Sequence, residues 1–79
     1  DVDLILKRIQ NRYSKQPLST IDGVRIEFDR EWVHLRKSNT EPIIRIYSES
    51  ETQTTAINLA NKIISDIKEI ITEPRDYGN

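Results

Sequence analysis

The strongest structural signal in the chain is the stretch Asp22-Gly23-Val24-Arg25-Ile26-Glu27-Phe28. An Asp-Gly pair favours a tight hairpin turn, because glycine accepts a positive φ and aspartate tolerates one. The apolar residues that follow alternate with charged residues, which is typical of a strand with one face in the core and the other in water. The stretch therefore predicts a turn that leads into a strand of an antiparallel sheet.

Three further strands are predicted around this one. Residues 18–21 form a short segment that favours a strand, and residues 29–31 form a polar turn. In the two segments that follow, alternate residues take opposite faces, as they do in a strand. The opposing sets are Val33 and Leu35 against Trp32, His34 and Arg36, and then Ile44 and Ile46 against Ile43, Arg45 and Tyr47.

Helices are predicted at both ends of the chain. Residues 1–12 carry apolar side chains at helical spacing, and Pro17 makes continuation of this helix unfavourable. Their apolar residues are Val2, Ile5, Leu6 and Ile9, followed by Tyr13. The last helix has an apolar stripe of about five turns that Pro74 ends, before a loose tail at residues 74–79. The stripe consists of Ala56, Ile57, Ala60, Ile63, Ile64, Ile67, Ile70 and Ile71.

The start of the last helix can be placed in two registers. Ser50-Glu51-Thr52-Gln53 fits a capping box, with Glu51 near the positive end of the helix dipole. The overlapping stretch Ser48-Glu49-Ser50-Glu51 fits the same pattern one half-turn earlier. The predicted fold is therefore α+β in two layers: helix, four-stranded antiparallel sheet, helix, with both helices on one face of the sheet.

The composition of the chain argues against several classes of function. The 79 residues suffice for a single domain, and a net charge of −1 provides no general attraction for nucleic acid or anionic lipid. The chain has no cysteine and no apolar run long enough to span a membrane. We therefore expect a cytoplasmic domain that binds neither nucleic acid nor membrane.

One segment suggests chemistry: Arg36-Lys37-Ser38-Asn39-Thr40-Glu41-Pro42-Ile43-Ile44-Arg45, which joins the last two predicted strands. Two guanidinium groups bracket hydroxyl and amide donors, a combination suited to a phosphate dianion. Asn39 tolerates the backbone of a tight turn, and Pro42 stiffens the loop. Glu41 would repel a phosphate, so we expect it to pair with an arginine or to cap the turn. From physics alone, a solvated hairpin loop explains these residues equally well.

The same segment resembles a family motif. Arg-x-Ser-(Gly/Asn)-Thr-Glu-Pro-x-x-Arg is similar to the phosphate-binding loop in the C-terminal domain, the fourth, of the α-D-phosphohexomutases. That superfamily includes phosphomannomutase/phosphoglucomutase and phosphoglucosamine mutase, and its fourth domain has a fold like that of the TATA-box-binding protein. The resemblance extends upstream through residues 22–25 and 32–33, and downstream through residues 47–49.

The resemblance implies a role for each matching position. Substrate phosphate would be bound by Arg36, Ser38, Asn39, Thr40 and Arg45, while Glu41 and Pro42 would shape the loop; Lys37 occupies a variable position. The chain would be one piece of a four-domain enzyme that moves a phosphoryl group within a hexose phosphate. Its sugar would be mannose, glucose or glucosamine, and Asn39 resembles the phosphomannomutase/phosphoglucomutase branch. The family's catalytic serine and Mg²⁺ loop have no counterpart in this sequence and would lie in the other three domains. The resemblance therefore implies that this chain has no catalytic residue and no metal site of its own.

Other residues have competing interpretations. His34 could reach a phosphate but is more typical of a surface strand residue. Trp32 and Tyr47 could stack on a sugar, but aromatic residues in such positions more often pack at the sheet edge or against a neighbouring domain. A basic patch on the first helix could bind nucleic acid, as an autonomous binding module would, or could simply be solvated. Its residues are Lys7, Arg8, Arg12 and Lys15. A purely structural interaction domain is the third possibility.

Overall fold

The computed structural model describes residues 1–73. Its elements in chain order are α1 (Val2–Arg12), β1 (Leu18–Ser19), β2 (Val24–Phe28), β3 (Glu31–Lys37), β4 (Ile44–Glu49) and α2 (Gln53–Thr72). This order confirms the prediction of helix, four strands and helix. The predicted tail, residues 74–79, lies outside the described residues.

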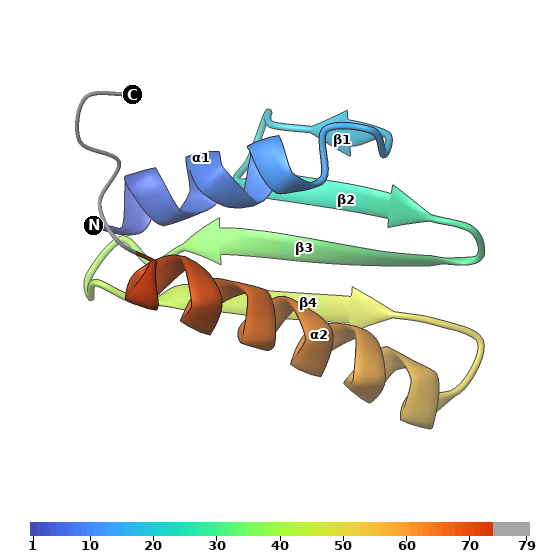
Figure 1. Cartoon of the computed structure of the whole chain (residues 1–79). Coiled ribbons are helices and arrows are strands. Elements are labelled where there is room, and N and C mark those ends of the chain that lie inside the picture. Colours follow the sequence, from blue (N-terminus) through green and yellow to red (C-terminus); the bar gives the residue numbers. More distant parts are fainter. Residues whose placement is uncertain (74–79) are drawn as a thin grey trace.

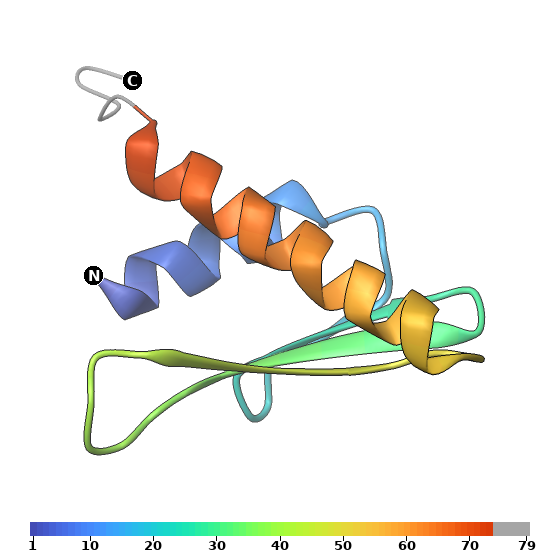
Figure 2. The ribbon, with the colours of Figure 1, turned by 90° about the horizontal axis from the view of Figure 1, so that it is seen from below.

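The four strands form one antiparallel sheet in the order β1-β2-β3-β4, so each strand pairs with its neighbour in sequence (Figure 1). Both helices lie on the same side of this sheet, as Figure 2 shows. The predicted two-layer α+β arrangement is therefore confirmed. Within residues 1–73 no helix lies on the opposite face of the sheet, and both the β1–β2 turn and the β3–β4 loop bend towards that face (Figure 2).

The core lies between the sheet and the helices. The inward-facing residues of β2 and β3 meet the apolar faces of α1 and α2, as the strand alternation and the helical spacing predicted. The buried residues are Leu6, Ile9, Val24, Ile26, Val33, Leu35, Leu59, Ile63 and Ile70. Because Val33 and Leu35 face the helices, the alternate residues of β3 must face the open side of the sheet.

The predicted apolar stripe of α2 is only partly buried. Ile63 and Ile70 belong to the core, together with Leu59, which the predicted stripe omitted. Ile57, Ile64 and Ile71 remain exposed, to as much as 62% for Ile71. These three residues are spaced seven apart and lie along one flank of the helix, where a single sheet beneath the helix cannot reach them.

The start of α2 also differs from both predicted registers. Thr52 is the N-cap residue, and its side chain accepts a hydrogen bond from the Thr55 backbone N–H at 3.1 Å. The Thr55 hydroxyl in turn receives the Thr52 backbone N–H, which completes a capping box in which threonine replaces the usual Glu or Gln. Glu51 stands just outside the helix, where it pairs with Arg30 at 3.6 Å.

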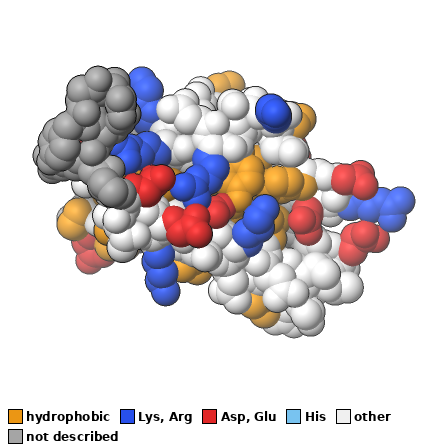
Figure 3. Space-filling model, in the orientation of Figure 1, with side chains coloured by type: hydrophobic (Ala, Val, Ile, Leu, Met, Phe, Trp, Pro, Cys, Tyr) orange, Lys and Arg blue, Asp and Glu red, His pale blue; other side chains and the backbone are white. Residues whose placement is uncertain are grey.

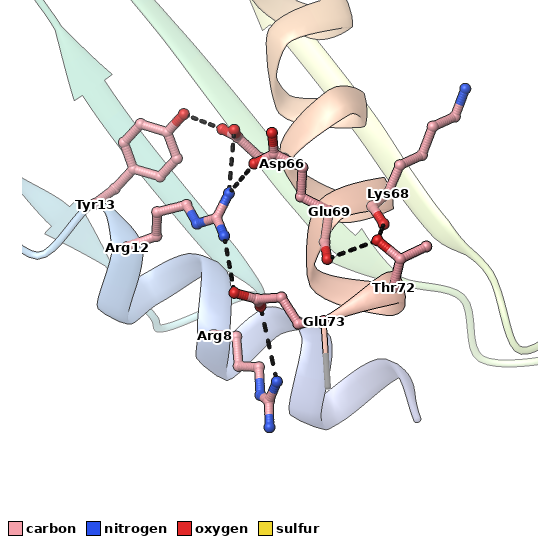
Figure 4. A network of polar contacts seen from close by, with 8 residues as sticks. All are labelled: Arg8, Arg12, Tyr13, Asp66, Lys68, Glu69, Thr72 and Glu73. Carbon is pink, nitrogen blue, oxygen red and sulfur yellow. Dashed lines mark hydrogen bonds and ion pairs between the residues drawn. The ribbon is translucent and has the colours of Figure 1, made fainter. Parts of the chain in front are cut away.

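Polar contacts join α1 to α2 at the edge of the core (Figure 4). The Arg12 guanidinium contacts Glu69 at 2.8 Å and Asp66 at 3.4 Å, and also pairs with Glu73 at 3.5 Å. The Tyr13 hydroxyl donates to the carboxylate of Asp66. Burial, and then this hydrogen bond, raise the pKa of Tyr13 well above its ordinary value. The phenol therefore stays protonated in the folded chain at a pH where an unfolded tyrosine ionises.

This pKa difference predicts a pH dependence of stability. A group whose pKa is raised by folding stabilises the protein below its unfolded pKa, about 10 for tyrosine, and loses that contribution as the pH rises further. We expect Tyr13→Phe to lower the free energy of unfolding by roughly 1–2 kcal/mol at pH 7. The deficit should shrink between about pH 10 and 12. Urea unfolding at a series of pH values measures it, and a deficit that grows with pH would contradict the assignment.

Candidate functional site

The two arginines of the motif face each other across adjacent strands. Arg36 of β3 is the direct antiparallel partner of Arg45 of β4. Like charges opposite each other on a sheet destabilise it, because their β-carbons lie only about 5 Å apart. Both side chains belong to the open face, where no helix covers them. An anion held between the two guanidiniums would relieve this repulsion.

The loop that follows Arg36 is held by its own backbone. The Ser38 N–H donates to the carbonyl oxygen of Ile43 at 3.1 Å, and this bond closes the loop at residues 38–43. Ser38 is the buried polar residue of the described chain, with 8% of its surface exposed. Its Oγ accepts the Thr40 N–H at 3.4 Å, so the hydroxyl keeps its own proton available for a ligand.

All five predicted phosphate ligands line a single pocket of about 320 Å³. Its lining residues are Arg36, Lys37, Ser38, Asn39, Thr40, Arg45 and Tyr47. The structure therefore brings together the residues that the sequence singled out, together with Tyr47. Arg36 and Arg45 both line this pocket, so two positively charged side chains border one cavity.

Three residues of the motif are not among the predicted phosphate ligands, and of these Lys37 alone lines the pocket. The Lys37 ammonium reaches Asp3 of α1 at 3.1 Å, which directs it towards the helical layer. Pro42 lies against an apolar groove between β4 and α2 and not in the polar pocket. Among the ion pairs of residues 1–73 none includes Glu41, so the predicted pairing with an arginine is absent there; its carbonyl oxygen instead accepts the Ile43 N–H at 2.8 Å.

The Asp22-Gly23 turn supports Arg36 from the neighbouring connection. The Asp22 carboxylate pairs with the Arg36 guanidinium at 3.3 Å, and its backbone carbonyl oxygen lies 2.5 Å from Nε2 of His34. Gly23 makes this approach possible: its φ is +72°, and a β-carbon there would lie 2.2 Å from the carbonyl oxygen of Leu35. The sequence revealed the turn but not its contact with Arg36.

Gly23→Ala should therefore disturb the pocket as well as the fold. The left-handed backbone and the clash with β3 are expected to cost about 1–3 kcal/mol of folding free energy. We expect the turn to shift away from β3, which would release Arg36 from Asp22. Chemical unfolding and the NMR signal of the Arg36 Nε–H measure the two effects. Thr20→Ala, an exposed position in the same connection, is the matched control, and equal behaviour of both variants would refute this interpretation.

The two arginines of the predicted basic patch pair with acidic residues at the C-terminal end of α2. Arg8 pairs with Glu73 at 3.9 Å, and Arg12 joins the network described above. On the helix-covered face, basic and acidic side chains lie next to one another and do not form a continuous positive surface (Figure 3). In residues 1–73, no three His, Asp or Glu side chains gather as metal ligands would, and no helix is long and apolar enough to cross a membrane.

The family assignment rests on comparison with known sequences. The sequence model of "Phosphoglucomutase/phosphomannomutase, C-terminal domain" matches residues 2–66. A probable phosphoglucosamine mutase of Methanopyrus kandleri is 36% identical over 73 residues, which is 92% of this chain and 16% of that protein. A phosphoglucosamine/phosphogalactosamine mutase of Sulfurisphaera tokodaii is 40% identical over 72 residues, 89% of this chain and 15% of that protein.

The match spans most of the fold and the whole polar pocket. The chain therefore belongs to the family of C-terminal domains of phosphoglucomutases and phosphomannomutases, within the phosphohexomutase superfamily, as the motif predicted. It spans about one sixth of the length of these curated relatives, which are named as mutases.

Proposed function

We propose that this domain binds the phosphate group of a hexose phosphate that its parent enzyme isomerises. The observation that carries the proposal is the cross-strand arginine pair that shares one pocket with Ser38, Asn39 and Thr40. Each guanidinium can approach a phosphate through two N–H groups, and the hydroxyl and amide groups supply shorter donors. Most of a dianion's charge is balanced by Arg36 and Arg45.

Within the parent, the domain would hold the phosphate that is not being transferred. Phosphoryl transfer depends strongly on positioning, so an anchor remote from the reacting bond can contribute much of the rate. The domain would also close over the sugar and exclude water from it. The catalytic serine and the Mg²⁺ ion that the family resemblance implies would belong to the other domains.

Two indications bear on the sugar, and they differ. Asn39 favours the phosphomannomutase/phosphoglucomutase branch, whereas the relatives described above are named as mutases of amino sugars. Identity over most of the domain outweighs one position, so we propose glucosamine phosphate as the substrate to test first. Glucose and mannose phosphates are the comparison.

Titration of the ¹⁵N-labelled chain tests the proposal. Inorganic phosphate and glucosamine 6-phosphate should shift the amide signals of Ser38, Asn39 and Thr40, with a Kd of roughly millimolar that weakens as salt is added. Arg36→Ala and Arg45→Ala should each weaken binding by about tenfold or more, the loss expected for a charge-assisted contact.

Arg30→Ala is the matched control. It removes the same charge, but Arg30 lies in the β2–β3 turn at the opposite end of the sheet (Figure 1). The Arg30→Ala variant should bind phosphate with an affinity close to that of the wild type. The proposal fails if no amide in the loop shifts with up to tens of millimolar ligand, a limit set by weak binding of small anions, or if Arg30→Ala weakens binding as much as the pocket variants do.

Kinetics of the full-length parent provide an independent test. Arg45→Ala there should raise KM and lower kcat together, because the phosphate contact persists from the bound substrate into the transition state and also orients the reacting group. Unchanged values of both constants would contradict a role in substrate binding.

A further inference from the structure

The open face of the sheet continues beyond the arginine pair as an ordered row of side chains. His34 of β3 is the cross-strand partner of Tyr47 of β4, one step along the strands from Arg36 and Arg45. Residues two apart on a strand lie on the same face about 7 Å from each other. A second aromatic position, Trp32, follows one step further. A ligand that extends from the arginine pair along the sheet therefore meets His34 and Tyr47 first.

The side chains that β3 contributes to this row already make contacts within the domain. His34 and Arg36 both contact Asp22, which draws them towards the β1–β2 turn. The Arg25 guanidinium lies 4.1 Å from the centre of the Trp32 ring and covers it as a cation–π partner. The accessible part of the row is therefore the β4 side.

Tyr47 is the open aromatic residue of that side. It lines the pocket with both arginines, whereas His34 and Trp32 do not. Its exposed fraction is 44%, and no hydrogen bond or aromatic contact within residues 1–73 engages it. A large apolar ring left uncovered beside a polar pocket is a usual feature of small-molecule sites, in which an aromatic wall lies next to a few polar groups that fix orientation.

We propose that Tyr47 forms the platform on which the sugar ring rests when its phosphate lies between Arg36 and Arg45. This inference rests on the proposed phosphate site and adds to it a residue that touches the sugar. The distance of about 7 Å from Arg45 along the strand suits a hexose ring joined to its phosphate by one or two bonds. The C–H face of the sugar packs on the ring, and the phenol hydroxyl is free to bond a sugar hydroxyl group.

The platform predicts a preference for sugar phosphate over phosphate. The wild-type chain should bind glucosamine 6-phosphate about three- to tenfold more tightly than inorganic phosphate, the gain expected for one aromatic packing contact. Tyr47→Ala should reduce this ratio to about one. Tyr47→Phe keeps the ring and should retain most of the preference. NMR titration of each variant with both ligands gives the ratio directly.

A second measurement tests for direct contact between Tyr47 and the sugar. With the sugar phosphate bound, nuclear Overhauser effects should connect the ring protons of Tyr47 to sugar C–H protons, and Tyr47→Phe should keep them. Ile57→Ala, which removes an exposed apolar side chain from α2 on the opposite layer, is the control and should leave the ratio unchanged. Tyr47→Leu replaces Tyr47→Ala if the alanine variant does not give a folded spectrum.

The outcomes separate the two proposals. If phosphate binds at the loop but Tyr47→Ala keeps the wild-type ratio, or no Tyr47–sugar effect is seen, the platform is refuted and the phosphate site stands. Tyr47 would then be available to pack against another part of the parent enzyme. If neither ligand shifts the loop, the phosphate site fails and the platform fails with it.

Discussion

Two arginines face each other on neighbouring strands of this domain. The pocket depends on the fact that the fold keeps them there despite their mutual repulsion. The register between β3 and β4 places Arg36 opposite Arg45, and that pairing is fixed by Val33 and Leu35, whose side chains must enter the core. A shift by one residue would expose these apolar side chains and bury the charges. The hydrophobic effect therefore holds the two arginines opposite each other, although their electrostatics disfavours that position. The Asp22 carboxylate offsets part of this repulsion at Arg36, and an anion in the pocket would offset more of it.

The connections at this end of the sheet keep the pocket shaped without a ligand. The β3–β4 loop is closed by the bond from Ser38 to Ile43, and Pro42 restricts the backbone beside it. The β1–β2 turn approaches β3 closely because Gly23 has no side chain, and it brings Asp22 to Arg36. Donors that are already oriented would lose less conformational entropy if a ligand bound to them.

The two faces of the sheet have different roles. The helical layer supplies the core and the polar α1–α2 contacts around Arg12 and Asp66, and it also engages Lys37 through Asp3. No helix of the described part of the chain covers the opposite face, which presents the arginine pair with Tyr47 beside it. Because β-strand residues alternate between faces, the same strands can stabilise the fold and display the site. The exposed isoleucines of α2 show that this layer is not fully covered within the described domain.

The sequence is enough to predict the order of elements and the inward residues of the strands. It also singles out the residues of the segment 36–45 that line one pocket. Strand alternation, turn chemistry and a dense motif are local properties. The cap of α2 and the buried share of its isoleucines could not be predicted, because several registers satisfy the local pattern and only packing on the sheet selects one. The sequence placed Asp22 in a turn and Tyr47 on a strand face. The ion pair of Asp22 with Arg36 and the place of Tyr47 beside both arginines depend on which strands pair and in which register. Such long-range contacts are not encoded by any local pattern.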